Sequence, residues 1–304
     1  MWKYKKVVSC KHHSSWQYPI PTRKSTHMVK IITDTTSCLS PEFARKYDIP
    51  VIPQVINFGD ESYLEGVNMS IADFMLRLKA SAELPKTAAP PVALFVKEFE
   101  RLVPLGEPIL CIHPSTEVSG TVRSAQVAAQ EFPHADIRII DTRLIASPLA
   151  ALVQQAAEWA LEGLDIDTIE ARVREMMARG RVYFMVATLE YLAKGGRIGG
   201  AAALVGSMLQ IKPLLTIRDG KVDVLEKERT HRRAVERLQE LVMAQIKPEN
   251  GFLSVLQAGV PEQGQALANS LSARLGLVDI PIYNMPPAIV THGGPGILGV
   301  GFFV

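Results

Sequence analysis

The chain has 304 residues, of which 47% are hydrophobic and 21% are charged, with a formal net charge of +2. These values are typical of a globular protein with room for one large α/β domain or two ordinary ones. No apolar run reaches the roughly 20 residues that span a bilayer, so we expect no stable membrane insertion. The three cysteines lack metal-ligand spacing, and this sparse use favours a reducing, cytoplasmic location.

Basic residues are concentrated at the start of the chain. Residues 1–27 contain six lysines and arginines and no acidic residue, so residues 28–304 carry a net negative charge. That balance argues against nucleic acid as the partner. The segment has neither the apolar core of a secretory signal nor hydrophobic periodicity. We therefore predict a disordered basic extension over 1–27, with folding beginning at Met28.

From Met28 onward, short β-rich runs alternate with longer helical segments. The strands expected in the first half are 29–33, 51–58, 109–112 and 137–140. The helices expected there begin at Ser70 and Pro91 or cover 121–132, 149–161 and 167–180. This alternation predicts an N-terminal α/β domain over residues 28–178, with a mostly parallel sheet flanked by helices.

A second α/β domain, with a parallel or mixed sheet, is predicted over residues 179–304. Its expected strands are 181–187, 214–217, 221–228, 252–258, 280–285 and 298–304, and its helices are 201–210, 230–246 and 262–275. Asp219-Gly220 predicts a tight hairpin turn between two of these strands. Because ligands bind beyond the carboxyl ends of strands in α/β folds, the loops there are the first places to look for a site.

Five such loops are rich in small hydroxyl residues, glycine or histidine: 33–37, 87–91, 115–121, 194–200 and 291–296. Hydroxyls and free backbone amides at a helix N-terminus favour an anion such as a carboxylate or a phosphate. The same residue types also serve as ordinary helix caps and turns, which is the structural alternative for each loop. The pattern alone therefore indicates an anion-binding α/β protein and no more.

Enzyme motifs give little support to a catalytic function. The segment 294–299 fits GxGxxG, but too little chain follows for a βαβ unit, and no phosphate-binding GxxxxGK[ST] loop occurs. Ser119 is not part of a GxSxG motif. Two alternatives stay open: a kinase or phosphotransferase subunit, and a serine hydrolase with Ser119 as its nucleophile.

Seven segments, most of which belong to these loops, occur in a fixed order along the chain: IITDTTSCL at 31–39, TAAPP at 87–91, STEVSGT at 115–121, YLAKGGRI at 191–198, KPLL at 212–215, RT at 229–230 and HGGPG at 292–296. In this order they resemble the DegV family of bacterial fatty-acid-binding proteins. The match covers essentially all of residues 28–304. The resemblance implies two DegV-like α/β domains and a carrier of one long-chain fatty acid, with no metal and no cofactor beyond that ligand.

By the same resemblance, Thr87 and Ser119 hydrogen-bond the fatty-acid carboxylate. Arg197 and His292, from the second domain, lie near the headgroup or the transferred phosphoryl group. In relatives, a separate ATP-dependent fatty acid kinase converts the bound acid to an acyl phosphate for phospholipid synthesis. The protein would then be a monomeric, non-catalytic subunit, and Arg229 would face the kinase.

Ser115, Gly120 and Arg229 form a second tier of candidate site residues. The sequence also departs from the family pattern, with Ala88 at a usual serine, Glu117 at a usual glycine and Pro148 where glycine is frequent. We expect the Glu117 carboxylate to point to solvent, because an inward carboxylate would oppose the binding of an anion.

Overall fold

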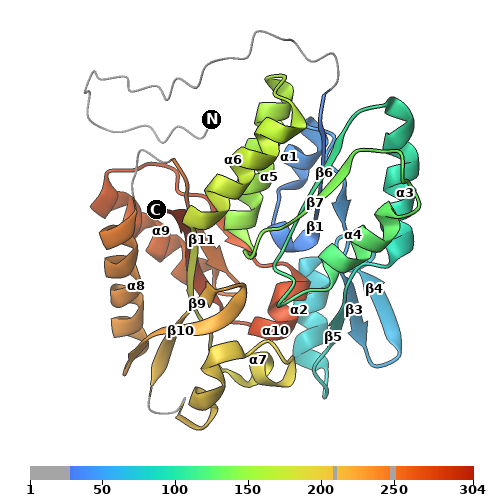
Figure 1. Cartoon of the computed structure of the whole chain (residues 1–304). Coiled ribbons are helices and arrows are strands. Elements are labelled where there is room, and N and C mark those ends of the chain that lie inside the picture. The colour runs from blue at the N-terminus through green and yellow to red at the C-terminus, as the bar shows by residue number, and fades with distance from the viewer. Residues whose placement is uncertain (1–27, 208–210, 247–250) are drawn as a thin grey trace, which may run out of the picture.

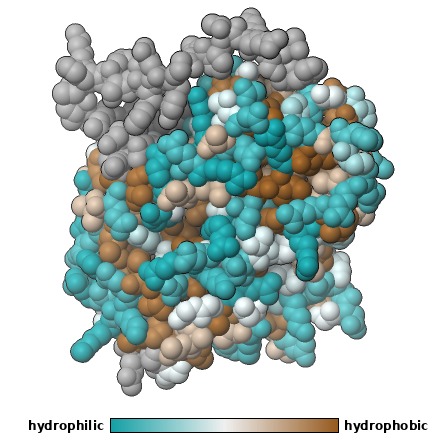
Figure 2. Space-filling view, viewed as in Figure 1, coloured by the Kyte–Doolittle hydropathy of each residue, from teal (hydrophilic) through white to brown (hydrophobic). Residues whose placement is uncertain are grey.

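The computed structural model describes residues 28–207, 211–246 and 251–304, and the predicted extension over 1–27 lies outside this part. Three sheets and their flanking helices form two halves that pack side by side (Figure 1). The predicted α/β class is confirmed. On the face shown in Figure 2, hydrophilic residues surround separate hydrophobic patches. Within the described residues, no helix combines the length and the apolar character needed to cross a membrane.

The first sheet is fully parallel, with the strand order β2-β1-β6-β7. Its strands are β1 (Lys30–Asp34), β2 (Val51–Ile52), β6 (Ile109–His113) and β7 (Ile137–Asp141). Every residue of β6 is buried, because helices cover both faces of the sheet and no position faces water.

Two groups of helices cover this sheet. One face packs on α3 (Val92–Leu102) and α4 (Thr121–Ala129), and the other on α1 (Pro41–Lys46), α5 (Ser147–Leu161) and α6 (Ile166–Arg179). Short 3-10 turns, η1 (Thr35–Ser37) and η2 (Val103–Leu105), follow β1 and α3. The layers on the two faces explain why the apolar runs of this half are continuous rather than alternating.

The single strand predicted over 51–58 is wrong, because Pro53 divides it. Pro53 has no backbone N–H to add to a ladder, and the N–H of Gln54 donates to Thr35 Oγ1 instead. Downstream, β3 (Val55–Phe58) forms an antiparallel sheet with β4 (Glu61–Leu64) and β5 (Lys86–Ala88), covered by α2 (Ile71–Ala80). Gln54 lies just before this small sheet and Thr87 lies within it, and both line the cavity between the two halves.

The second half holds a six-stranded sheet with the order β10-β9-β8-β13-β11-β12, in which only β11 and β12 are parallel. Its strands are β8 (Gly180–Met185), β9 (Lys212–Arg218), β10 (Lys221–Glu228), β11 (Leu253–Gln257), β12 (Ile282–Asn284) and β13 (Leu298–Phe303). The last strand in sequence, β13, therefore lies in the middle of the sheet, between β8 and β11.

Helices of the second half lie on both sides of this sheet. They are α7 (Glu190–Lys194), α8 (His231–Gln245), α9 (Pro261–Leu275) and α10 (Pro287–Gly293), together with the 3-10 segment η3 (Gly199–Ser207). The helices α8 and α9 pack against β13 and β11 over one core, whereas α7 and α10 belong to the core that faces the first half. Figure 1 shows α10 at the junction, near α2 and β5.

The predicted hairpin and the predicted cap of α8 are confirmed. Asp219 and Gly220 have φ values of 49° and 80°, the left-handed pair that a tight type I′ turn requires. Thr230 accepts a hydrogen bond from the Arg233 N–H and so begins α8.

The α-helix predicted over 201–210 is wrong where it can be followed. The segment forms the 3-10 turns of η3, and residues 208–210 lie outside the described part. A Cβ at Gly199 would lie 2.1 Å from the Val222 carbonyl oxygen. The backbone therefore packs directly on β10, and Gly199 and Gly200 disfavour a regular helix there.

The division into domains at residues 178 and 179 stays a prediction. The strands of the first half end at Asp141 and those of the second begin at Gly180. Between them, α5 contacts strands of both large sheets, and Ser147 Oγ lies 2.7 Å from Ser254 Oγ. The two halves consequently share a buried junction, and the cavity described next opens from it.

Candidate functional site

A cavity of about 110 Å³ lies between the two halves. Its walls come from β5, the loop before α4, the strands β8–β11, and α10. Most of its lining is apolar and includes Ile145, Val182, Phe184, Leu256, Met285 and Ile297. Polar side chains occur at one end, namely Thr36, Gln54, Thr87, Ser119, Arg197 and His292. This division into a polar end and an apolar remainder is typical of a site for a small molecule with a long apolar part.

Thr87 and His292 meet at the polar end although they lie 205 positions apart. Thr87 Oγ1 is 2.7 Å from His292 Nε2. Pairing of β5 with β3 places Thr87 opposite Ile56, and α10 packs against both strands and carries His292. The contact therefore exists only when the two halves are assembled.

Ser119 enters the cavity from the loop between β6 and α4. Its Oγ lies 2.7 Å from Thr121 Oγ1 and accepts a hydrogen bond of 3.3 Å from the Thr121 N–H. Ser119 is half-buried, whereas Thr121 is fully buried at the first turn of α4. Gly120 and Ala88 also line this end and are exposed to solvent, so the polar end of the cavity lies at the surface.

Arg197 joins the glycine-rich loop of the second half to the Ser119 loop. Its Nε donates to the Val118 carbonyl oxygen over 3.1 Å, and its Nη1 donates to the Gly195 carbonyl oxygen over 2.7 Å. These two bonds hold the guanidinium at the cavity wall. Arg197 thus brings a positive charge to the polar end and fixes the loop that carries Ser119.

His292 is neutral at physiological pH. Burial, and to a lesser extent the positive charge of Arg197, lower the pKa of its imidazole from 6.5 to about 4. Its Nδ1 is buried and has no hydrogen-bond partner among the described residues. A Cβ at Gly195 would lie 2.2 Å from this nitrogen, so only glycine lets the loop approach the ring so closely.

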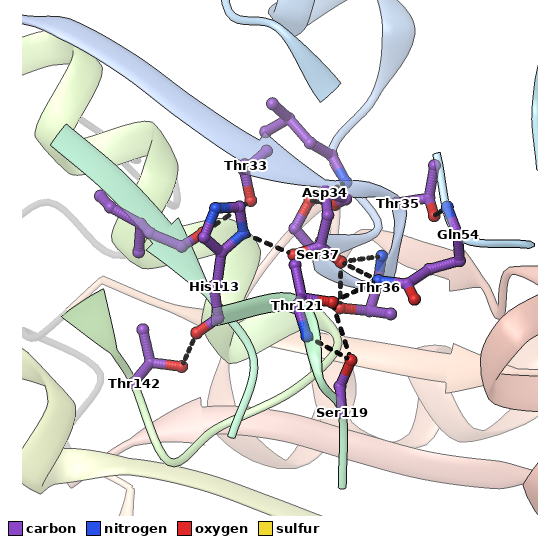
Figure 3. Close-up of polar contacts among 12 residues, drawn as sticks. Thr33, Asp34, Thr35, Thr36, Ser37, Gln54, His113, Ser119, Thr121 and Thr142 are labelled. Atoms are coloured by element: carbon purple, nitrogen blue, oxygen red, sulfur yellow. Dashed lines mark hydrogen bonds and ion pairs between the residues drawn. The ribbon is translucent and has the colours of Figure 1, made fainter. Parts of the chain in front are cut away.

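A buried polar network behind Ser119 was missed by sequence reasoning (Figure 3). Asp34 Oδ1 accepts hydrogen bonds from Thr36 N, Thr36 Oγ1 and Gln54 Nε2, and Asp34 Oδ2 lies 2.8 Å from His113 Nδ1. Asp34 also caps the turn η1, as expected from its position after a strand. The cap was predictable from local sequence, whereas Gln54 and His113 come from other elements and carried no local signal.

The remaining candidates lie in different places. Gly120 lines the cavity, but Ser115 does not: it is buried beside the Gly220 turn, and its Oγ accepts the Glu117 N–H. Arg229 is exposed near the start of α8 and is not part of the lining. The Glu117 carboxylate lies 3.0 Å from Lys221 Nζ and 3.4 Å from Arg143 Nη1. Glu117 is therefore held by two cations and is not among the cavity-lining residues.

The geometry around Ser119 does not support the alternative in which this residue is the nucleophile of a serine hydrolase. Ser119 Oγ is paired with Thr121, and the two histidines near this region are paired elsewhere, His292 with Thr87 and His113 with Asp34. A serine nucleophile needs a base within hydrogen-bond reach, which Ser119 lacks within the described part of the chain. These described residues also hold no cluster of three or more His, Cys, Asp or Glu side chains suited to a metal ion.

Comparison with known proteins places this architecture in a family. The family model described as "Uncharacterised protein, DegV family" matches residues 28–304. The chain belongs to the DegV family. A DegV domain-containing protein of Halalkalibacterium halodurans is 35% identical over 278 residues, which cover 91% of this chain and 98% of that protein.

Solved DegV structures share the fold over nearly their whole length. A DegV family protein of Thermus thermophilus, described by its fatty acid binding, has a TM-score of 0.83 and 27% identity, covering 91% of this chain and all of that one. A stearic acid-binding protein of Eubacterium ventriosum has a TM-score of 0.82 and 26% identity, covering 91% of this chain and 98% of that one. This DegV chain is thus similar throughout its described body to proteins that bind fatty acids.

Proposed function

We propose that this DegV protein is a carrier of one long-chain fatty acid, whose carboxylate is held by Thr87 and Ser119. The observation that carries the proposal is a cavity with one polar end at the surface and an apolar remainder between the two halves. A fatty acid has the same division into a charged head and a long apolar tail. The fatty acid binding described for similar structures supports the same ligand class.

The apolar lining accounts for affinity, and the polar end accounts for orientation. Burial of each methylene contributes roughly 0.8 kcal/mol, so a long tail in this cavity supplies most of the binding free energy. A carboxylate is costly to bury unpaired. The hydroxyls of Thr87 and Ser119 donate to it, while the Arg197 guanidinium lies at the same end and offsets its charge.

The polar end lies where a second protein can reach the headgroup of the bound acid. Ala88 and Gly120 are exposed beside it, so a carboxylate held there is reachable while the tail stays buried. We propose that an ATP-dependent fatty acid kinase phosphorylates the carried acid to an acyl phosphate for phospholipid synthesis. Arg197 and His292 would stabilise charge on the reacting group, and Arg229 would face the kinase. The carrier itself would act as a cytoplasmic monomer.

Mass spectrometry of lipid extracted from the purified protein tests the proposal. We expect about one fatty acid per wild-type chain and little or none in the Thr87→Ala/Ser119→Ala double variant. Loss of two hydrogen bonds to a charged group predicts an affinity at least about 100-fold lower.

The matched control is Ser254→Ala, which removes a buried hydroxyl that contacts Ser147 and lies outside the cavity lining. This variant should retain its lipid. A wild-type protein that carries no lipid and takes up no added fatty acid would refute the carrier function. Formation of acyl phosphate by the wild-type chain alone, with ATP and Mg²⁺, would favour the kinase alternative instead.

A further inference from the structure

We infer that Asp34 and Gln54 orient a chain of hydrogen bonds so that Ser119 offers its hydroxyl hydrogen to the cavity. The inference rests on the proposed function and deepens it, because it explains how the site selects a headgroup that only accepts hydrogen bonds. Asp34, Gln54 and Thr121 are then positioning residues that act through Ser119. The contacts are drawn in Figure 3.

The chain begins at the Asp34 carboxyl group, which is fully buried. Asp34 Oδ1 accepts from the Thr36 backbone N–H over 3.0 Å, a group that can only donate. Its other oxygen faces His113 Nδ1, and His113 Nε2 has no partner among the described residues. The imidazole hydrogen is therefore best placed on Nδ1, where it donates to Asp34. Both oxygens of Asp34 act as acceptors.

An acceptor at Asp34 determines which way the Gln54 amide points. Gln54 Nε2 lies 3.1 Å from Asp34 Oδ1 and 2.8 Å from Thr121 Oγ1. The reversed amide would place its oxygen against Asp34 Oδ1, with two acceptors facing each other in a site that excludes water. The –NH₂ group consequently faces both neighbours and donates one hydrogen to each.

The orientation of the Gln54 amide determines which hydroxyl donates in the hydrogen bond between Thr121 and Ser119. Because Thr121 Oγ1 accepts from Gln54, its own hydrogen is available to Ser119 Oγ, 2.7 Å away. The Thr121 backbone N–H donates to the same Ser119 oxygen over 3.3 Å. Ser119 Oγ therefore accepts twice from Thr121, and its own hydrogen is free to point into the cavity that it lines.

The direction of these hydrogen bonds determines which ligand headgroup the site prefers. A carboxylate accepts hydrogen bonds and cannot donate them, so it matches a Ser119 that donates. An alcohol both donates and accepts, so it can adapt to either direction of the chain. The affinity ratio of a fatty acid to the alcohol of the same length consequently reports the direction of the hydrogen bonds and is insensitive to tail burial.

The test is the isosteric variant Gln54→Glu. A glutamic acid beside Asp34 shares a proton with that carboxyl group and presents an acceptor to Thr121. Thr121 then donates to residue 54 and accepts from Ser119, which leaves Ser119 without a hydrogen for the ligand. Stearate and 1-octadecanol are titrated as competitors of a fluorescent fatty acid. The stearate-to-octadecanol affinity ratio should fall roughly tenfold or more, as expected for one lost charge-assisted hydrogen bond.

A second substitution separates orientation from simple structural damage. In the Gln54→Glu/Thr121→Val double variant, Ser119 no longer has a hydroxyl acceptor at residue 121, so its hydrogen returns to the cavity. The ratio should recover to within a few-fold of the wild type. The single variant Thr121→Val should keep a high ratio, although it removes a link of the chain. The uncharged variant Gln54→Met serves if Gln54→Glu does not fold, and its ratio should lie below that of the wild type.

Each outcome bears on one proposal only. A wild type that binds neither ligand refutes the carrier function. A wild type that binds stearate, with an unchanged ratio in both Gln54 variants, refutes the orienting role and leaves the carrier function standing. A ratio that falls in Gln54→Glu and stays low after Thr121→Val is added would also refute the orienting role, because structural damage alone gives that result.

Discussion

Replacing Glu65 by glutamine is expected to raise the free energy of unfolding at pH 8 by roughly 3 kcal/mol. Glu65 is buried between the small sheet and α10, where Ala288 N donates to Oε1 over 2.7 Å and Thr35 Oγ1 donates to Oε2. Burial, opposed in part by these two hydrogen bonds, raises the pKa of its carboxyl group from 4.5 to about 7. An amide of the same shape removes the charge that this site disfavours.

The pH dependence follows from the direction of that shift. A carboxyl pKa raised on folding contributes stability that is complete below about 4.5 and is lost as the pH rises through about 7. The advantage of Glu65→Gln should therefore be large at pH 8 and small at pH 5. His292 acts in the opposite sense, because a lowered imidazole pKa contributes stability above about 6.5 that is lost as the pH falls towards 4.

Urea unfolding at pH 5 and pH 8 measures both effects. In Glu65→Gln, only the His292 contribution should remain, so stability should decrease from pH 8 to pH 5 more than in the wild type. Glu83→Gln, at an exposed carboxylate, is the control and should follow the wild type at both values. Equal stabilities of Glu65→Gln and the wild type at pH 8 would show that Glu65 is accommodated without cost.

Alanine at position 195 is expected to weaken fatty-acid binding by roughly 10- to 100-fold. Its Cβ would lie 2.2 Å from His292 Nδ1 and 2.9 Å from the Tyr191 carbonyl oxygen. The ring is the part that can move, and its displacement breaks the contact with Thr87 Oγ1. The loop that Arg197 ties to Val118 would shift as well, so both sides of the headgroup site would be disturbed.

Gly206→Ala is the matched control for this substitution. Gly206 lies further along in η3, and among the described residues other than its chain neighbours no heavy atom lies within 4 Å of the position of its Cβ. It should bind fatty acid as the wild type does, measured by displacement of a fluorescent fatty acid. Undiminished binding by Gly195→Ala would contradict the close approach of this loop to His292.

Much of the fold could be predicted because its determinants are local. The runs around Ile31, Cys111 and Ile139 are mostly apolar and predicted the parallel strands, and Thr230 and Asp219-Gly220 marked a cap and a turn. Predictions failed where tertiary packing opposed the local pattern. Pro53 divides one apolar run between two sheets, and Gly199 packs on β10 where a helix was expected.

The site could be predicted only as far as family resemblance reached. Thr87, Ser119, Arg197 and His292 all line one cavity, although the roles assigned to them stay predictions. Gln54 is different, because its importance comes from two contacts with residues 20 and 67 positions away. A single glutamine after a proline has no periodicity or spacing that would reveal such contacts.

The central place of β13 has a consequence for synthesis of the protein in the cell. Leu298–Phe303 pairs with β8 on one side and β11 on the other, so it is synthesised after both of its partners. The six-stranded sheet, and with it the cavity wall that includes Val182 and Leu256, cannot close before β13 has been synthesised. A chain truncated before Leu298 would leave the facing edges of β8 and β11 unpaired, and exposed strand edges favour aggregation.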